Sequence, residues 1–178
     1  MIKGDSEEYD LLEKWSKFDC QGHYSCEIGV RQGLGSKIIM DNVKNNYIHI
    51  GIDPYANLEY QHYDDSGKYT CDYTDDMRDQ LLEDMKAYKG RFTLYNDTDT
   101  KFMSDRAHQD SKFAFVHFDG PHMTRDVITE VIWFVNRAAP MTRYVFDDFT
   151  KYNMQLIRDM LKYYDFDILD EGKNKICL

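Results

Sequence analysis

The sequence has 178 residues, a length that fits a single domain spanning 1–178. Its 32 acidic and 22 basic residues give a formal net charge of −10, which disfavours nucleic acids and anionic membranes as partners. The sequence opens without an apolar signal core and has no run long enough to span a membrane, so we expect a cytoplasmic protein. No Cys-x-x-Cys pair occurs among Cys20, Cys26, Cys71 and Cys177, which are expected to be free thiols.

Apolar β-prone runs alternate along the chain with segments that carry apolar residues at helical spacing. In chain order the predicted elements are a helix over 11–18 within an N-terminal region 1–22, a strand over 23–30, a helix over 36–43, a strand over 45–53, a helix over 77–88, a strand over 91–95, a short helix over 99–108, a strand over 113–119, a helix over 127–138, a strand over 143–149, a helix over 154–164, and closing strands over 165–169 and 174–178. Asp5 or Ser6 is the predicted cap of the first helix. Residues 55–74 are rich in tyrosine and lack periodicity. We interpret them as an insertion with a turn at 65–67 that either covers a substrate or packs on itself.

This alternation predicts an α/β fold: a doubly wound, mostly parallel, seven-stranded sheet with helices on both faces. Ligands bind such sheets beyond the carboxyl ends of the strands, where the strand order reverses. The acidic residues at predicted strand ends are Glu27, Asp53, Asp97, Asp119, Asp147 and Asp148.

A glycine turn follows the first predicted strand, in CEIGVRQGLGSK. Gly29, Gly33 and Gly35 let the backbone turn sharply in front of a helix N-terminus, which favours polar or anionic ligand groups. The spacing differs from the dinucleotide pattern G-x-G-x-x-G, and an ordinary loop is the alternative. Asp53 ends the second strand, where an acid can bind the ribose hydroxyls of a nucleoside or, alternatively, serve only as a turn residue.

Two further motifs, VHFDGPH and VFDDF, follow later strands. Asp119 is expected to point into the cleft, while His117 is interpreted as structural and His122 is open between a structural and a catalytic role. Asp147 and Asp148 are adjacent carboxylates that need a cation or a proton. Together with Asp119 they suit magnesium, whereas the alternative leaves Asp147 alone in the cleft and lets Asp148 cap the next helix.

The series EIGVRQGLGS, GIDPY, VHFDGPH and VFDD resembles the class I S-adenosylmethionine-dependent methyltransferases, which have a Rossmann-like fold. More narrowly, it is similar to the metal-dependent group of macrocin-type sugar O-methyltransferases. The resemblance implies that Glu27, Gly29 and Gly33 hold the methionine part of the cofactor, Asp53 the ribose, and Asp97 the region of the adenine. It also implies that Asp119, Asp147 and Asp148 bind the metal, and that Asp119 serves as base.

The expected reaction is methyl transfer from S-adenosylmethionine to a hydroxyl of a small molecule such as a sugar or a catechol-like diol. A bound Mg²⁺ would orient the acceptor, and Asp119 or His122 would take its proton. The alternatives are a metal-independent methyltransferase and a non-catalytic binding protein that retains the fold. The sequence leaves the oligomeric state open.

Overall fold

The structure, a computed structural model, describes residues 2–19, 23–43, 47–56, 59–61, 68–70 and 73–178. In chain order its elements are α1 (Tyr9–Ser16), β1 (Tyr24–Ile28), α2 (Leu34–Asn42), β2 (Ile48–Ile52), β3 (Glu59–Gln61), β4 (Lys68–Thr70), α3 (Asp75–Asp84), the 3-10 helix η1 (Met85–Tyr88), β5 (Phe92–Tyr95), α4 (Asp99–Ser104), η2 (Arg106–His108), β6 (Phe113–Phe118), α5 (Thr124–Val135), β7 (Ala138–Phe146), η3 (Phe149–Lys151), α6 (Met154–Lys162), β8 (Asp170–Glu171) and β9 (Ile176–Cys177).

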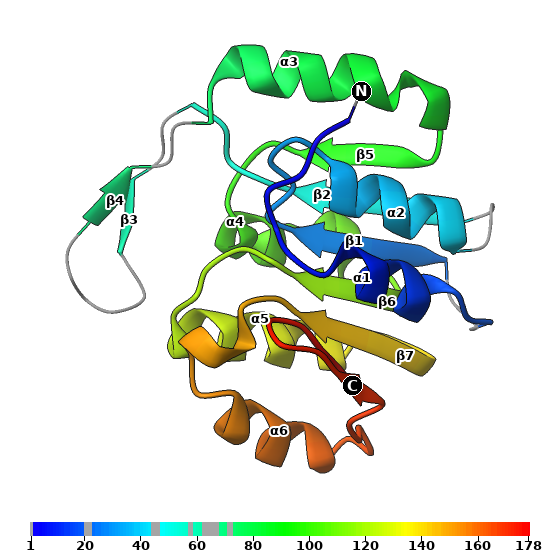
Figure 1. Cartoon of the computed structure of the whole chain (residues 1–178), viewed down its shortest axis with the longest axis vertical. Helices are drawn as coiled ribbons and strands as arrows, with labels where there is room; N and C mark the ends of the chain where they lie inside the picture. The colour runs from blue at the N-terminus through cyan, green and yellow to red at the C-terminus, as the bar shows by residue number, and fades with distance from the viewer. Residues whose placement is uncertain (1, 20–22, 44–46, 57–58, 62–67, 71–72) are drawn as a thin grey trace.

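The main sheet has seven strands in the order β5-β2-β1-β6-β7-β9-β8. Figure 1 shows β5, β2, β1, β6 and β7 side by side in this order. The first five of these are parallel, whereas β9 runs antiparallel to β7 and β8 antiparallel to β9. The prediction of a mostly parallel seven-stranded α/β sheet is therefore confirmed. In the register of the parallel strands, Ile28 lies beside both Ile52 and Phe118, so β1, β2 and β6 end at the same edge.

Helices pack on the sheet through two main clusters of buried side chains. Val116 and Phe118 of β6 belong to the cluster that contains residues of α4, α5 and α6. Phe115, which points to the other face of the same strand, belongs to the cluster with residues of α1 and α2. The face beneath α1 and α2 also carries the buried polar residues of the site described below.

Two local predictions at the ends of the chain are wrong. The first concerns the cap of α1, because Glu8 precedes this helix with a φ of 54° and makes no capping side-chain bond. The second concerns the closing strand over 165–169, since β8 begins only at Asp170. Asp165 has a φ of 61°, and the amide of Phe166 bonds back to the carbonyl of Leu161, so the chain is still turning there.

The tyrosine-rich segment contains β3 and β4, which pair antiparallel as a separate two-stranded sheet. In Figure 1 this pair projects to the left of the main sheet. The predicted turn at 65–67 lies outside the described residues. Tyr55 and Tyr73, at the two ends of the segment, have ring centroids 6.1 Å apart.

Cys26 and Cys177 are free and buried. Cys20 and Cys71 lie outside the described residues. Among the helices that the structure describes, none is both long and apolar enough to cross a bilayer.

Candidate active site

The glycine turn joins β1 to α2 at the centre of the sheet. Gly29 and Gly33 have φ angles of 85° and 87°, a region that side chains with a Cβ rarely adopt. A Cβ on Gly29 would also lie 2.0 Å from the carbonyl oxygen of Asp119. The backbones after β1 and β6 therefore touch at Gly29, and only glycine fits there.

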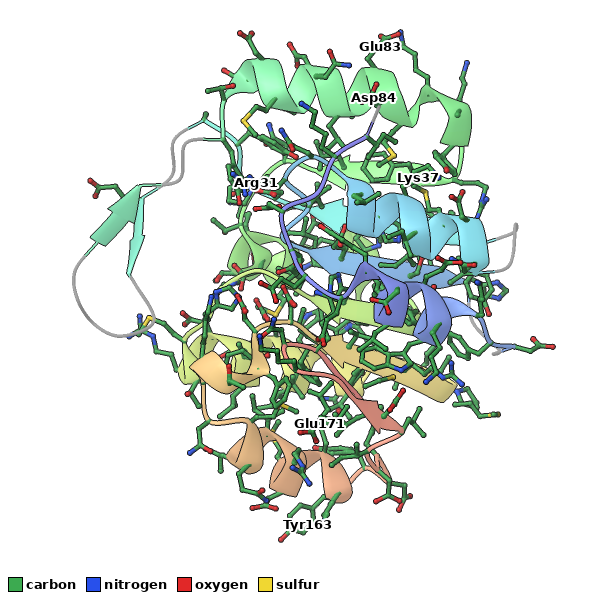
Figure 2. All side chains as sticks on the ribbon, in the orientation of Figure 1. Arg31, Lys37, Glu83, Asp84, Tyr163 and Glu171 are labelled. Atoms are coloured by element: carbon green, nitrogen blue, oxygen red, sulfur yellow. The ribbon has the colours of Figure 1, made fainter. Side chains whose placement is uncertain are left out.

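Asp53 ties the end of β2 to this turn. Its Oδ2 accepts hydrogen bonds from the amides of Val30 at 2.9 Å and Arg31 at 2.7 Å. Burial raises the pKa of Asp53 to about 6, against the opposing effect of these two donors. Both amides bind the same oxygen, so among the described residues Oδ1 is left for a ligand. Figure 2 labels Arg31 at the turn, where its guanidinium pairs with Asp5.

A cavity of about 350 Å³ opens beside the turn, a volume within the range of small-molecule sites. Its lining includes Gly29, Asp53, Thr98, Asp99, Asp119 and Gly120. It lies where β1 has β2 on one side and β6 on the other, which is the switch point of the strand order. The structure thus brings Gly29, Asp53 and Asp119 together at one cavity, as the sequence predicts.

Glu27 is buried on the α2 side of β1. It accepts a hydrogen bond from Ser36 Oγ at 2.5 Å and pairs with His117 Nδ1 at 2.8 Å. A Cβ on Gly35 would lie 1.9 Å from Glu27 Oε1, so the third glycine of the turn makes room for this carboxylate. Glu27 is therefore held beneath the first turn of α2.

Asp119 and Asp147, at the ends of β6 and β7, share a hydrogen bond. Burial and the neighbouring Asp147 raise the pKa of Asp119 well above its ordinary value. Burial also works to raise the pKa of Asp147, but the bond from Asp119 and the charge of Lys175 outweigh it and lower this pKa. A proton shared by the pair is therefore held more readily by Asp119 than by Asp147.

Lys175 supplies the cation at this point. It is fully buried, and its ammonium pairs with Asp147 Oδ1. The ammonium also donates to Ser6 Oγ at 2.6 Å and lies 3.4 Å from His117 Nε2. Ser6 in turn donates to Asp147 Oδ2 at 2.7 Å. Both oxygens of Asp147 are thus engaged.

Asp148 points to a different set of partners. Its Oδ2 lies 2.6 Å from Lys151 Nζ and 3.6 Å from His122 Nε2, and its φ is 48°. It forms no capping side-chain bond, and α6 is capped instead by Asn153, which accepts from the amide of Leu156 at 3.1 Å. Asp148 therefore stands at the N-cap position of η3 without capping it through its side chain, and its carboxylate pairs with Lys151 instead.

As they stand, the three predicted ligands do not fit a magnesium ion. Lys175 already neutralises Asp147, Asp119 is bonded to Asp147, and Asp148 faces a lysine. Magnesium demands an octahedron of oxygen ligands. Among the described residues, the acidic and histidine side chains that offer three ligand atoms within 4.8 Å of one another are Glu27, His117 and Asp119, two of which are already paired.

Asp97, the residue predicted near the adenine, bends back on its own loop. Its Oδ1 accepts from the amide of Thr98 at 2.8 Å, and Thr98 caps α4. The cavity wall at this corner is formed by Thr98, Asp99 and Thr100. Asp99, and not Asp97, therefore lines the cavity at the place predicted for the adenine.

Sequence reasoning missed three residues around the Asp147 carboxylate: Ser6, Glu8 and Lys175. Glu8 accepts from the backbone amides of Lys173, Asn174 and Lys175 at 2.7, 2.8 and 2.9 Å, which fixes the segment that carries the lysine. The available signal was weak: a lysine inside the otherwise apolar closing run KICL. Lysine is seldom fully buried without a partner, so a buried closing strand that contains Lys175 predicts a carboxylate beside it.

Several of the solved structures similar to this chain are described as methyltransferases, and at their low identities the likeness shows the fold alone. CalS11, described as a calicheamicin methyltransferase, has a TM-score of 0.71 at 14% identity, with 95% of this chain and 76% of that chain covered. The O-methyltransferase TomG from Streptomyces achromogenes, solved with SAM, has a TM-score of 0.65 at 11% identity over 99% of this chain and 81% of that chain. Cofactor-bound Rv0187 from MTB has a TM-score of 0.59 at 11% identity, and the 83% of this chain that aligns covers only 57% of that chain.

The chain therefore shares its fold with solved methyltransferases. Residues 26–149 match the family described as "Methyltransferase domain", and the chain belongs to this family. None of the curated proteins matches the sequence closely enough to be compared with it.

Proposed function

We propose that this chain is an S-adenosylmethionine-dependent O-methyltransferase that acts on a small hydroxylated molecule. The observation that carries the proposal is the cavity where Gly29, Asp53 and Asp119 meet. Membership of the methyltransferase family and the SAM-bound neighbour TomG support the choice of cofactor.

S-adenosylmethionine, when bound, supplies an electrophilic methyl group. Asp53 has one carboxylate oxygen left for the ribose hydroxyls, and Gly29 lines the same cavity where the turn meets the backbone after β6. Glu27 is buried behind the turn and does not line the cavity, so its proposed role is to hold the turn through Ser36 at the start of α2. Positioning of the acceptor against the methyl group accounts for much of the rate in such transfers.

Asp119 is the proposed base. Its carboxyl lines the cavity, and its raised pKa makes it a strong proton acceptor once it is ionised. With S-adenosylmethionine bound, Asp119 would hold the acceptor hydroxyl toward the methyl group and, once the proton shared with Asp147 has left, would take the proton of that hydroxyl. His122, beside Asp148 in the next loop, is the second candidate for this proton.

We propose that the reaction proceeds without a divalent metal, because Asp147 already pairs with Lys175. The proposed acceptor is a small molecule such as a sugar or a catechol-like diol. The acidic surface expected from a net charge of −10 supports this choice over a nucleic acid. The alternative is a binding protein that retains the fold without the reaction.

Calorimetry with S-adenosylhomocysteine tests the cofactor site. Asp53→Ala should weaken binding by roughly 1.5–3 kcal/mol, the scale of hydrogen bonds to a charged group. Asp159→Ala, which removes an exposed acid on α6, is the matched control and should bind like the wild type. Absence of S-adenosylhomocysteine binding to the wild-type chain would refute the proposed cofactor site.

A methyl-transfer screen with sugar and catechol acceptors tests the reaction. Asp119→Asn should bind the cofactor nearly as well as the wild type but lose most of the turnover, since its amide cannot take a proton. A chain that binds the cofactor and methylates none of these acceptors would favour the non-catalytic alternative.

A further inference from the structure

The buried ammonium of Lys175 stands at the end of a row of hydrogen-bonded polar groups on one face of the sheet. His49 bridges Ser25 at 2.9 Å and Ser36 at 3.0 Å, and Ser36 leads to Glu27. From Glu27 the row continues through His117 to Lys175, and from there to Asp147 and Asp119. It therefore connects the acid beneath the cofactor turn with the acid that lines the cavity.

This row contains three carboxyl groups, of which Glu27 and Asp147 are almost fully buried. A buried carboxylate without a countercharge is costly, and a proton, a metal ion or a basic side chain can supply the compensation. Lys175 is the basic side chain that touches Asp147. The side chain of Lys175 has no exposed surface, and its ammonium also donates a hydrogen bond to the hydroxyl oxygen of Ser6.

The position of Lys175 is fixed by elements that do not belong to the cofactor site. Glu8 binds the amides of the segment that carries Lys175, and the Tyr9 ring lies 5.8 Å from the ammonium. Ser6 and Lys175 both lie outside residues 26–149, the part of the chain that matches the family. The cation is thus a feature of this chain's flanking segments.

We propose that Lys175 occupies the cation position of the acceptor site, where it supplies the positive charge for Asp147 and Asp119 and excludes a divalent ion. The inference rests on the proposed function and adds to it the class of acceptor. Because no metal has to be chelated, a single hydroxyl suffices and a vicinal diol is not required. Lys175 acts through Asp147 and Asp119, so its role is to position and neutralise.

Manganese binding tests the exclusion directly and needs neither cofactor nor acceptor. Free Mn²⁺, followed by its electron paramagnetic resonance signal, should remain free in the presence of the wild-type chain. Lys175→Met removes the ammonium at similar side-chain length, and it should bind Mn²⁺ at least about tenfold more tightly than the wild type. Addition of Asp147→Asn to this variant should abolish the gain.

Lys151→Met is the matched control, because it removes an exposed lysine that pairs with Asp148 and leaves Lys175 in place. It should bind no more Mn²⁺ than the wild type. Thermal unfolding gives a second measurement that still works for a weakened variant. Mn²⁺ should raise the melting temperature of Lys175→Met and leave that of the wild type unchanged, because an ion that binds only the folded state stabilises it.

Wild-type binding of Mn²⁺ that is lost in Asp147→Asn would overturn the inference and restore the magnesium site. A folded Lys175→Met variant without any Mn²⁺ binding would also overturn it. If Lys175→Met does not fold even with Mn²⁺, Lys175→Arg decides: it keeps the cation and should keep both the fold and the exclusion of Mn²⁺, whereas Mn²⁺ binding to it overturns the inference.

The acceptor class is tested by turnover of mono-hydroxylated and vicinal-diol acceptors in the presence of a chelator. We expect both types of acceptor to be methylated, with the chelator and without it. Turnover confined to diols in the presence of Mg²⁺ would contradict the inference. Failure of the wild type to bind S-adenosylhomocysteine would refute the proposed function alone, because the Mn²⁺ results do not depend on it.

Discussion

At the scale of single residues, the buried carboxylates of the site are compensated by groups of the chain itself. Asp53 receives two backbone amides, Asp147 receives a lysine, and Glu27 receives a serine and a histidine. The compensation at Asp53 is incomplete, since burial still raises its pKa to about 6. An acid of this kind carries a cost that a bound ligand can offset.

Asp53→Asn should therefore separate stability from binding. The ionised side chain penalises the folded state above pH 6, and the penalty is relieved as the pH falls from about 6 toward the ordinary value of 3.8. The variant should raise the free energy of unfolding at pH 8 by up to about 2 kcal/mol and weaken cofactor binding. Urea unfolding at pH 8 and pH 4 measures this. An equal effect at both pH values would contradict the assigned pKa.

At the scale of elements, Glu8 connects the start of α1 with the turn between β8 and β9. Three backbone amides bind its carboxylate, and the amide of Gly172 closes the same turn on the carbonyl of Lys175. Burial works to raise the pKa of Glu8, but these three donors and the charge of Lys175 outweigh it and lower the pKa. The contact thus favours the ionised form.

Glu8→Gln should loosen this turn. We expect roughly 1 kcal/mol of lost stability at pH 7, because the side chain is exposed to screening, and faster amide hydrogen exchange at residues 173–175. A lowered pKa gives stability that is present above the ordinary value of 4.5 and lost as the pH falls, so the difference from the wild type should shrink at pH 3. Glu13→Gln, which removes an exposed pair with Lys17, serves as the control.

Some elements could be predicted from the local sequence pattern alone. The strand over 113–119 was predictable because its residues up to Phe118 are apolar except His117, and β6 is fully buried as such a run predicts. The turn at Gly29 and the acid at Asp53 were predictable because chain order and residue type define them. The start of β8 was not, since the turn at Phe166 depends on its ring stacking on Tyr144, with centroids 4.6 Å apart.

The cation of the site was not predictable for a related reason. Ser6 and Lys175 are separated by 169 residues, and Ser6 and Asp147 by 141. No local sequence pattern links positions so far apart. From the sequence alone, the adjacent acids Asp147 and Asp148 therefore predicted a metal site. The structure separates them instead, because the positive φ of Asp148 turns its side chain toward Lys151.

At the scale of the whole molecule, the excess of acidic residues opposes binding to polyanions. A net charge of −10 should repel a phosphate backbone at every approach. Fluorescence anisotropy with single-stranded RNA and duplex DNA should therefore show no binding at physiological salt. Binding that weakens steeply as salt is added would contradict the expectation of a small-molecule acceptor.

The contribution of Ser6 and Glu8 bears on the design of shortened versions of this protein. A version trimmed to begin at Tyr9 would retain every strand of the main sheet and all of α1. It would nevertheless deprive the ammonium of its serine oxygen and the β8–β9 turn of its carboxylate. Circular dichroism measures secondary structure and would not detect this loss. The effect of such deletions should therefore be measured by ligand binding and not by helix content.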